Sequence, residues 1–173
     1  MLDRLGLSFD AYHYHTQTLS LRELAAAFPG VTIVCDHLST PLGIGPFAGD
    51  AKREEIFEQW RKDVAALASC ENVVMKLGGM AMPWNGFGWD QASRPPTSDA
   101  FVAAQGRYYD HAIEAFGAGR CMFESNFPVD KLSLSYDVLW NAFKKIAASA
   151  SEDEKQSLFR GTAMRVYRID PIR

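Results

Sequence analysis

Apolar positions along the chain follow two alternating spacings, and this alternation predicts an α/β fold. Four stretches have the composition of strands, at residues 7–15, 31–35, 73–77 and 121–123. The second and third are nearly continuous apolar runs, which is typical of strands covered on both faces. Between and after the strands, apolar residues recur at helical spacing over residues 21–28, 52–68, 101–116, 136–147 and 152–167. This order predicts a parallel sheet with right-handed crossovers.

Capping signals place two of the predicted helix starts. Ser20 with Glu23 and Ser151 with Glu154 have the spacing of a capping box, in which a serine and a glutamate bond the first backbone N–H groups of a helix. Residues 78–97 form a long loop after the third strand. Structureless loops of that length inside compact domains are usually functional. Its aromatic residues indicate either a substrate lid, which we favour, or a small satellite hydrophobic cluster: Trp84, Phe87 and Trp89.

The predicted order fits two architectures, an open doubly wound sheet or part of a (β/α)8 barrel. In both architectures the chemistry lies at the carboxyl ends of the strands. Polar side chains lie at the carboxyl ends of all four predicted strands: His13, His15 and Gln17; Asp36 and His37; Lys76; Glu124 and Asn126. We therefore expect these groups to meet at one end of the sheet.

Each of the strand-end histidines has more than one interpretation. His13 and His15 are two residues apart, so on a strand both point to one face and can reach one metal ion. The alternative is an aromatic strand with hydrogen-bonded histidines. His37 follows a buried strand and is either a metal ligand, a general base near physiological pH, or a residue that caps the next loop.

The other strand-end residues are equally open from sequence alone. Lys76 interrupts an apolar strand, so it either faces a substrate anion or pairs with a buried carboxylate. Glu124 and Asn126 share a face. An asparagine donates and accepts hydrogen bonds but does not take a proton at neutral pH. Asn126 therefore either positions a reacting group or satisfies the backbone of a tight turn before Pro128.

Composition removes several classes of function. The 173 residues suit one soluble domain, and the net charge of −3, from 18 basic and 21 acidic residues, is not what a nucleic-acid-binding surface needs. No apolar run approaches the roughly 20 residues that span a bilayer, so we expect neither a nucleic-acid nor a membrane partner. The first residues lack the features of a signal peptide. Three widely spaced cysteines suit reduced thiols, and we expect a cytoplasmic protein.

Motif searches exclude other sites. The phosphate-binding patterns GxGxxG and GxxxxGK[ST] are absent, as are the GxSxG nucleophile elbow, CxxC and HExxH. A doubly wound binding protein would need such a phosphate loop, so that alternative has no support.

Four segments at the strand ends, taken in order, resemble the amidohydrolase-related (amidohydrolase 2) family of TIM-barrel, often metal-dependent hydrolases, which includes lactonases and decarboxylases. The segments are Phe9-Asp-Ala-Tyr-His-Tyr-His-Thr-Gln17, Phe28-Pro-Gly-Val-Thr-Ile-Val-Cys-Asp-His37, Val74-Met-Lys-Leu-Gly-Gly79 and Arg120-Cys-Met-Phe-Glu-Ser-Asn-Phe-Pro128. Residues 161–169 resemble the closing helix of the family, with Thr162 where asparagine is usual. The resemblance covers nearly the whole chain.

The resemblance implies a partial (β/α)8 TIM barrel. In the family, a metal-binding HxH pair lies on a first strand well upstream of the strand that residues 7–15 match. Residues 1–173 therefore correspond to the last four β/α units, as one domain truncated at its N-terminal side, and His13 and His15 are not that pair. A half barrel has two unpaired edges, through which we expect it to form homo-oligomers.

The last strand departs from the family pattern. The family usually ends this strand with Gly-Ser-Asp-Trp-Pro, and its Asp is a metal ligand and proton acceptor in many members. Here the segment reads Glu124-Ser-Asn-Phe-Pro128. Asn126 replaces the Asp, and Glu124 restores a carboxylate nearby. We therefore expect no tight binding of zinc, the divalent metal typical of the family, with His37 the first ligand candidate if a metal binds.

The function that the resemblance implies is hydrolysis of a small molecule, a lactone or another cyclic ester. In this hypothesis the catalytic residues are His37, which activates water, Glu124 and Asn126, and the substrate-binding residues are His15, Gln17 and Lys76. The alternatives are an inactive barrel fragment and a decarboxylase-type lyase of the same family, so whether this chain alone is an enzyme stays open.

Overall fold

The computed structural model describes residues 1–170 and contains one four-stranded parallel sheet. Its strands lie side by side in chain order: β1 (Phe9–Ala11), β2 (Ile33–Cys35), β3 (Val73–Leu77) and β4 (Cys121–Phe123). All three strand pairs are parallel, as the alternation of strands and helices predicted. The carboxyl ends of the four strands therefore lie at one end of the sheet.

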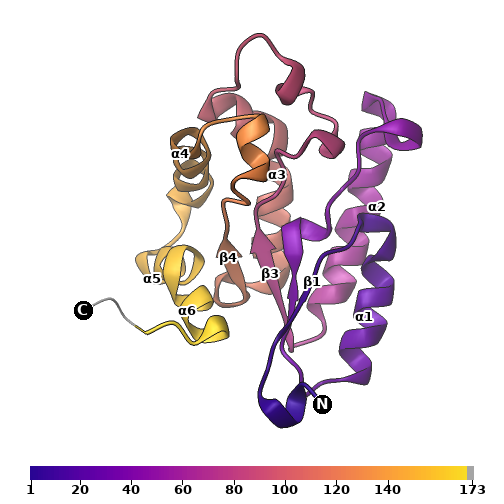
Figure 1. The fold of residues 1–173 in the computed structure, drawn as a ribbon, viewed down its shortest axis with the longest axis vertical. Helices are drawn as coiled ribbons and strands as arrows, with labels where there is room; N and C mark the ends of the chain where they lie inside the picture. Colours follow the sequence, from indigo (N-terminus) through magenta and orange to yellow (C-terminus); the bar gives the residue numbers. More distant parts are fainter. Residues whose placement is uncertain (171–173) are drawn as a thin grey trace.

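Six α-helices accompany the strands in the described part of the chain: α1 (Thr18–Ala27), α2 (Asp50–Ala68), α3 (Ser98–Phe116), α4 (Tyr136–Ile146), α5 (Glu152–Gln156) and α6 (Thr162–Tyr167). The first three connect consecutive strands. Figure 1 shows α1 and α2 along one side of the sheet and α5 and α6 beside β4.

The strand order supports a segment of a barrel and not a doubly wound sheet. Every β/α unit adds its strand at the same edge, whereas a doubly wound sheet reverses direction at a switch point. One face of the sheet packs on the helices through side chains such as Ile33, Met75 and Trp60. The opposite face carries Val34, Val74 and Met122, which pack against side chains of α6.

Two predicted boundaries near the amino terminus were wrong. The first strand ends at Ala11, because residues 15–17 turn into a short 3-10 helix in which the backbone N–H of Tyr14 donates to Gln17 Oε1 at 3.1 Å. The predicted helix 21–28 starts earlier, at Thr18, so Ser20 lies within its first turn and does not cap it.

The later helices follow the predicted pattern more closely. The capping box of Ser151 and Glu154 is confirmed, with the backbone N–H of Ser151 2.8 Å from Glu154 Oε2. The predicted helix 152–167 is interrupted by a π-helical turn at Ser157–Gly161. Among residues 1–170, no helix combines the length and the apolar character needed to cross a lipid bilayer.

The edges of β1 and β4 carry no strand partner within the described residues, and we propose that they associate with further copies of this chain. An apolar groove beside β1 is lined by Phe9, Leu24 and Phe28, among others. Sedimentation velocity is expected to show association that increases with concentration in the micromolar range. Leu24→Lys should weaken the association, and Leu132→Lys, at a side chain 63% exposed elsewhere, should not. A stable, cooperative monomer would contradict the proposal.

Candidate active site

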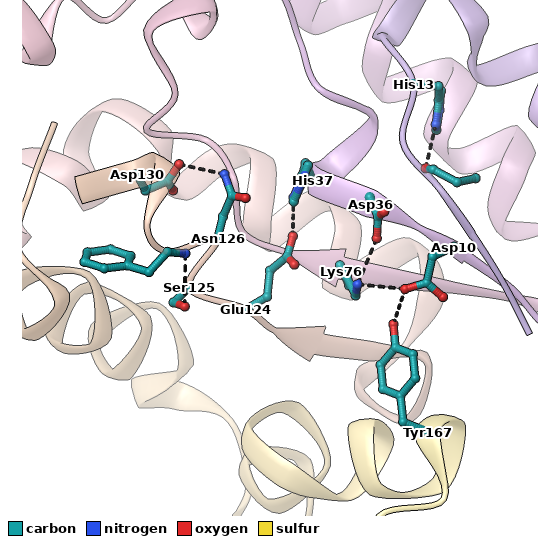
Figure 2. A network of polar contacts seen from close by, with 12 residues as sticks. Asp10, His13, Asp36, His37, Lys76, Glu124, Ser125, Asn126, Asp130 and Tyr167 are labelled. Carbon is teal, nitrogen blue, oxygen red and sulfur yellow. Dashed lines mark hydrogen bonds and ion pairs between the residues drawn. The ribbon is translucent and has the colours of Figure 1, made fainter. Parts of the chain in front are cut away.

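His37 and Glu124 form the centre of the site. They follow β2 and β4, and His37 Nδ1 is hydrogen-bonded to Glu124 Oε1. Figure 2 shows the two side chains pointing toward one another. Burial alone would lower the pKa of His37, but the hydrogen bond and the charge of Glu124 outweigh it, so the pKa is raised above its ordinary value. With Nδ1 bonded to the carboxylate, Nε2 is the nitrogen left to exchange a proton.

Two glycines allow this pair to form across the intervening strand. β3 lies between β2 and β4, and Gly78 and Gly79 follow it directly. A Cβ atom on Gly79 would lie 2.5 Å from His37 Cγ, and one on Gly78 would lie 2.3 Å from the backbone oxygen of Glu124. Any side chain at either position would therefore push the pair apart. Gly79 also has a φ of +67°, which favours glycine.

The backbone that carries His37 is held in an uncommon conformation. Four consecutive residues, 37–40, have positive φ angles between 36° and 56°, although none of them is glycine. Such strain persists only where surrounding contacts impose it, and it concentrates at functional sites. Trp60 Nε1 donates to the backbone oxygen of Leu38 at 2.7 Å, and Ser39 Oγ lies 3.2 Å from Cys35 Sγ. These buried contacts hold the backbone segment that carries His37.

Asp130 is a part of the site that the sequence did not indicate. Its carboxylate is fully buried, and Asn126 Nδ2 donates to Asp130 Oδ1 at 2.9 Å (Figure 2). Burial raises the pKa of Asp130 to about 7, even though the bond from Asn126 acts in the opposite direction. Because the Asn126 NH2 group is committed to Asp130, its amide oxygen is left for a water molecule or a substrate. Asn126 is therefore positioned by a second residue, four positions along the chain.

Lys76 is paired with carboxylates of the protein, whereas binding a substrate anion would need a free ammonium group. Its Nζ lies 2.9 Å from Asp10 Oδ2 and 3.0 Å from Asp36 Oδ1. The hydroxyl of Tyr167, from α6, donates to the same Asp10 oxygen at 2.6 Å. The ammonium group is thus neutralised by two carboxylates, and burial is outweighed by these contacts, so the pKa of Lys76 is raised. Of the two interpretations of Lys76, the structure supports the ion pair.

The other predicted site residues do not join the pair. His13 Nδ1 lies 3.2 Å from the backbone oxygen of Ala11, and Figure 2 shows this ring well apart from His37. His15 is buried, accepts the backbone N–H of Leu42 at 3.2 Å and packs against Phe47. Burial lowers the pKa of both histidines. Gln17 bonds to the backbone of Tyr14, as described above. These residues miss the predicted position because β1 ends at Ala11, and the residues after it no longer alternate between the two faces of a strand.

The aromatic residues of the 78–97 loop divide into two groups. Phe87 stacks on Trp89, which packs in turn against Phe101 of α3, so these two rings extend the main hydrophobic core and form neither a lid nor a separate cluster. Trp84 lies in a separate 3-10 turn, Pro83–Asn85, near Tyr12. The lid interpretation is therefore left to Trp84 alone.

The donor set does not suit a resident zinc ion. A structural or catalytic zinc site needs three or four converging protein ligands. In the part of the chain that the structure describes, no three His, Cys, Asp or Glu side chains converge in that way. His37 Nδ1 is taken by Glu124, and Asn126 presents a neutral amide. We therefore derive no chemical step through a metal.

A cavity of about 500 Å³ lies at the opposite end of the sheet from this chemistry. Three arginines line it, among them Arg120 and Arg165. Arg120 donates to four backbone oxygens, and Arg165 donates to that of Gly119. These guanidinium groups bond the chain to itself, so we place the site at the carboxyl ends of the strands.

Comparison with known proteins identifies the family. Residues 1–169 match the family model Amidohydro_2, described as amidohydrolase. The chain belongs to this amidohydrolase family, which confirms the resemblance seen in the four strand-end segments.

Individual relatives are about twice as long as this chain. The protein y4mH of Sinorhizobium fredii is 41% identical over 169 residues, which are 97% of this chain and 49% of that protein. An L-fucono-1,5-lactonase of Burkholderia multivorans is 30% identical over 162 residues, 93% of this chain and 51% of the lactonase. A crystal structure of a Burkholderia multivorans amidohydrolase with bound zinc matches with a TM-score of 0.82 and 26% identity, covering 98% of this chain and 55% of that one. The chain thus spans about half the length of the relatives that it matches.

Proposed function

We propose that this chain takes part in the hydrolysis of a small cyclic ester, a lactone. The observation that carries the proposal is the hydrogen bond between His37 Nδ1 and Glu124 at the carboxyl ends of the strands. Membership of an amidohydrolase family supports hydrolysis. The similarity to an L-fucono-1,5-lactonase supports a lactone as the substrate.

The proposed reaction uses His37 as a general base. Its Nε2 takes a proton from water as the water oxygen attacks the lactone carbonyl carbon. Glu124 keeps the proton of the neutral imidazole on Nδ1 and stabilises the imidazolium that forms. The ring C–O bond then breaks, and the proton passes from Nε2 to the leaving alkoxide. The product is an open-chain hydroxy acid.

Asn126 has an orienting role in this proposal. Asp130 holds its NH2 group, so the amide oxygen can accept a hydrogen bond from the attacking water. An amide cannot take the proton of that water, and this task falls to His37. Decarboxylation, the lyase alternative, needs no activated water and gains nothing specific from this arrangement.

A pH-indicator assay of lactone opening tests the proposal. We expect the purified chain to hydrolyse L-fucono-1,5-lactone faster than the buffer does, and His37→Ala to remove the excess rate. A rate that is equal for the chain, for His37→Ala and for buffer would contradict the proposal. Release of CO₂ from a carboxylic-acid substrate without lactone opening would instead indicate a lyase.

A further inference from the structure

The loops that follow β2 and β3 are joined to one another by hydrogen bonds. The backbone N–H of Gly43 donates to the backbone oxygen of Trp84 at 2.9 Å. Asn85 Nδ2 donates to the backbone oxygen of Pro41 at 2.8 Å, and the Asn85 side chain is buried from water. We call these four residues, together with Gly86, the loop junction.

The two backbones of the loop junction are in direct contact, because each loop has a glycine at the point where they meet. A Cβ atom on Gly43 would lie 2.2 Å from the backbone oxygen of Asn85, and one on Gly86 would lie 2.1 Å from that of Gly43. Both neighbours are backbone atoms, which cannot turn aside as the end of a flexible side chain can. Trp84 therefore lies on a fixed wall of the site and not on a lid that opens.

Arg53 of α2 supports the loop junction from outside. Its Nη2 donates to the backbone oxygen of Gly86 at 2.7 Å, and its Nη1 donates to that of Asn85 at 3.3 Å. The guanidinium carbon also lies 4.3 Å from the centroid of the Phe87 ring. Hydrogen bonds from a charged donor are about twice as strong as neutral ones, and a planar guanidinium reaches two oxygens at once. One side chain thus holds two consecutive carbonyl groups.

The strained residues 37–40 connect the loop junction to the proposed base. All four have positive φ angles, and Pro41, whose oxygen accepts the Asn85 bond, follows them directly. Such a conformation persists only where surrounding contacts impose it. If the bond to Pro41 is lost, this end of the segment can relax, and the imidazole of His37 can move away from Glu124.

We propose that Arg53 is a positioning residue: through Asn85 it holds the strained segment in place, so that the imidazole of His37 stays bonded to its carboxylate partner. The inference rests on the proposed function and goes beyond it, because it assigns a role in the reaction to a side chain of the outer helix α2. Displacing a catalytic group by about 1 Å can cost about 10²-fold in rate, so a brace outside the site affects the chemistry. A residue that acts in this way lowers kcat more than it raises KM.

Three variants separate positioning from a purely structural role. Arg53→Met keeps the apolar stem but removes both bonds to the loop junction, whereas Arg53→Lys keeps the charge and one bond. Arg107→Met is the matched control, because Arg107 is also half-buried and lies 3.9 Å from the Phe57 ring, but its guanidinium bonds to Glu54.

The rate of lactone hydrolysis is measured per folded molecule, because a purely structural role would lower the folded fraction and leave this rate unchanged. For Arg53→Met we expect kcat for L-fucono-1,5-lactone to fall about tenfold, with KM changed by less than about twofold. Arg53→Lys should stay within about threefold of the unmodified chain, and Arg107→Met should not change kcat. A kcat for Arg53→Met equal to that of the unmodified chain would overturn the inference.

The ring N–H of His37 provides a measurement that does not need catalysis. A histidine N–H that donates to a carboxylate gives a proton NMR signal downfield of the backbone amides, and its absence in His37→Ala identifies it. We expect this signal in the unmodified chain, in Arg53→Lys and in Arg107→Met, and its loss or faster exchange with water in Arg53→Met.

Three NMR results would overturn the inference: no such signal in the unmodified chain, an unchanged signal in Arg53→Met, or an equal loss in Arg53→Met and Arg107→Met. Loss of the signal in Arg53→Met alone, without lactone hydrolysis by any of the chains, would uphold the positioning of His37 and reject the proposed function.

Discussion

Replacing Glu124 with Gln is expected to lower the rate of lactone hydrolysis by about 10²- to 10⁴-fold. Glutamine has nearly the same shape as glutamate, but it carries no charge to stabilise the imidazolium of His37. Its NH2 group can also donate to Nδ1, which moves the imidazole proton to Nε2 and leaves no base facing the water. The effect rests on the proposed reaction and is measured as kcat in the pH-indicator assay.

The same substitution should also shift the pH dependence of the rate. His37 acts as a base only when it is neutral, so the rate rises as the pH passes upward through its pKa. Glu124 raises that pKa. In Glu124→Gln the residual rate should therefore reach its plateau at a lower pH than in the unmodified chain.

A surface glutamate provides the control. Glu54 pairs with Arg107 of α3 at 2.7 Å, and its side chain is 58% exposed. Glu54→Gln should leave both the rate and the pH profile unchanged. If Glu124→Gln kept the rate of the unmodified chain within about twofold, His37 would not depend on the carboxylate and the proposed mechanism would be wrong.

The frame of this site was predictable from sequence because it depends on local patterns. The apolar runs that form β2 and β3 can be recognised without knowing their neighbours, and parallel strands place their carboxyl ends together. This rule was enough to bring His37 and Glu124 to the same place, although 87 positions separate them.

The spacing of apolar residues does not predict which polar side chains bond one another in the site. Asp130 lies in a 3-10 turn after Asn126, in a segment with no helical or strand spacing, so nothing marked it as buried. Lys76 meets Asp10 from another strand and Tyr167 from the last helix. His15 left the predicted strand because the chain turned at Tyr14. For Lys76, contacts distant in sequence decided the outcome, whereas Asp130 and His15 are placed by local turns that carry no helical or strand spacing.

Loss of the Lys76 ammonium group should destabilise the fold. Its ammonium group lies between Asp10 and Asp36 on the face of the sheet opposite α1–α3, and its side chain is only 18% exposed. Lys76→Met keeps the length and the apolar stem of the side chain but leaves two carboxylates facing each other without a counter-ion. Removing one partner of a buried ion pair costs about 3 to 5 kcal/mol. Because the cluster is partly open to water, we expect a loss of about 2 to 4 kcal/mol in the free energy of unfolding at pH 7.

The loss should become smaller in acid. Burial already raises the pKa of Asp36 in the presence of Lys76, and without the lysine it rises further. Above the ordinary pKa of an aspartate the folded variant then binds more protons than the unfolded chain, so its free energy of unfolding increases as the pH falls toward that value. The raised pKa of Lys76 affects stability only at alkaline pH. There, loss of the ammonium proton would remove the stabilising ion pairs with Asp10 and Asp36 from the unmodified chain.

Urea denaturation at pH 5, 6 and 7 measures the loss of unfolding free energy and its dependence on pH, with each variant compared with the unmodified chain at the same pH. This comparison cancels the contribution of Asp130, whose pKa of about 7 also makes the unmodified chain more stable as the pH falls toward 5. Lys145→Met is the control, because Lys145 pairs with Asp99 at 2.6 Å while the two side chains are 42% and 82% exposed. Such a surface pair contributes about 0 to 1 kcal/mol. Two results would show that Lys76 does not neutralise Asp10 and Asp36. One is an equal loss of unfolding free energy in Lys76→Met and Lys145→Met, and the other is a loss in Lys76→Met that does not change with pH.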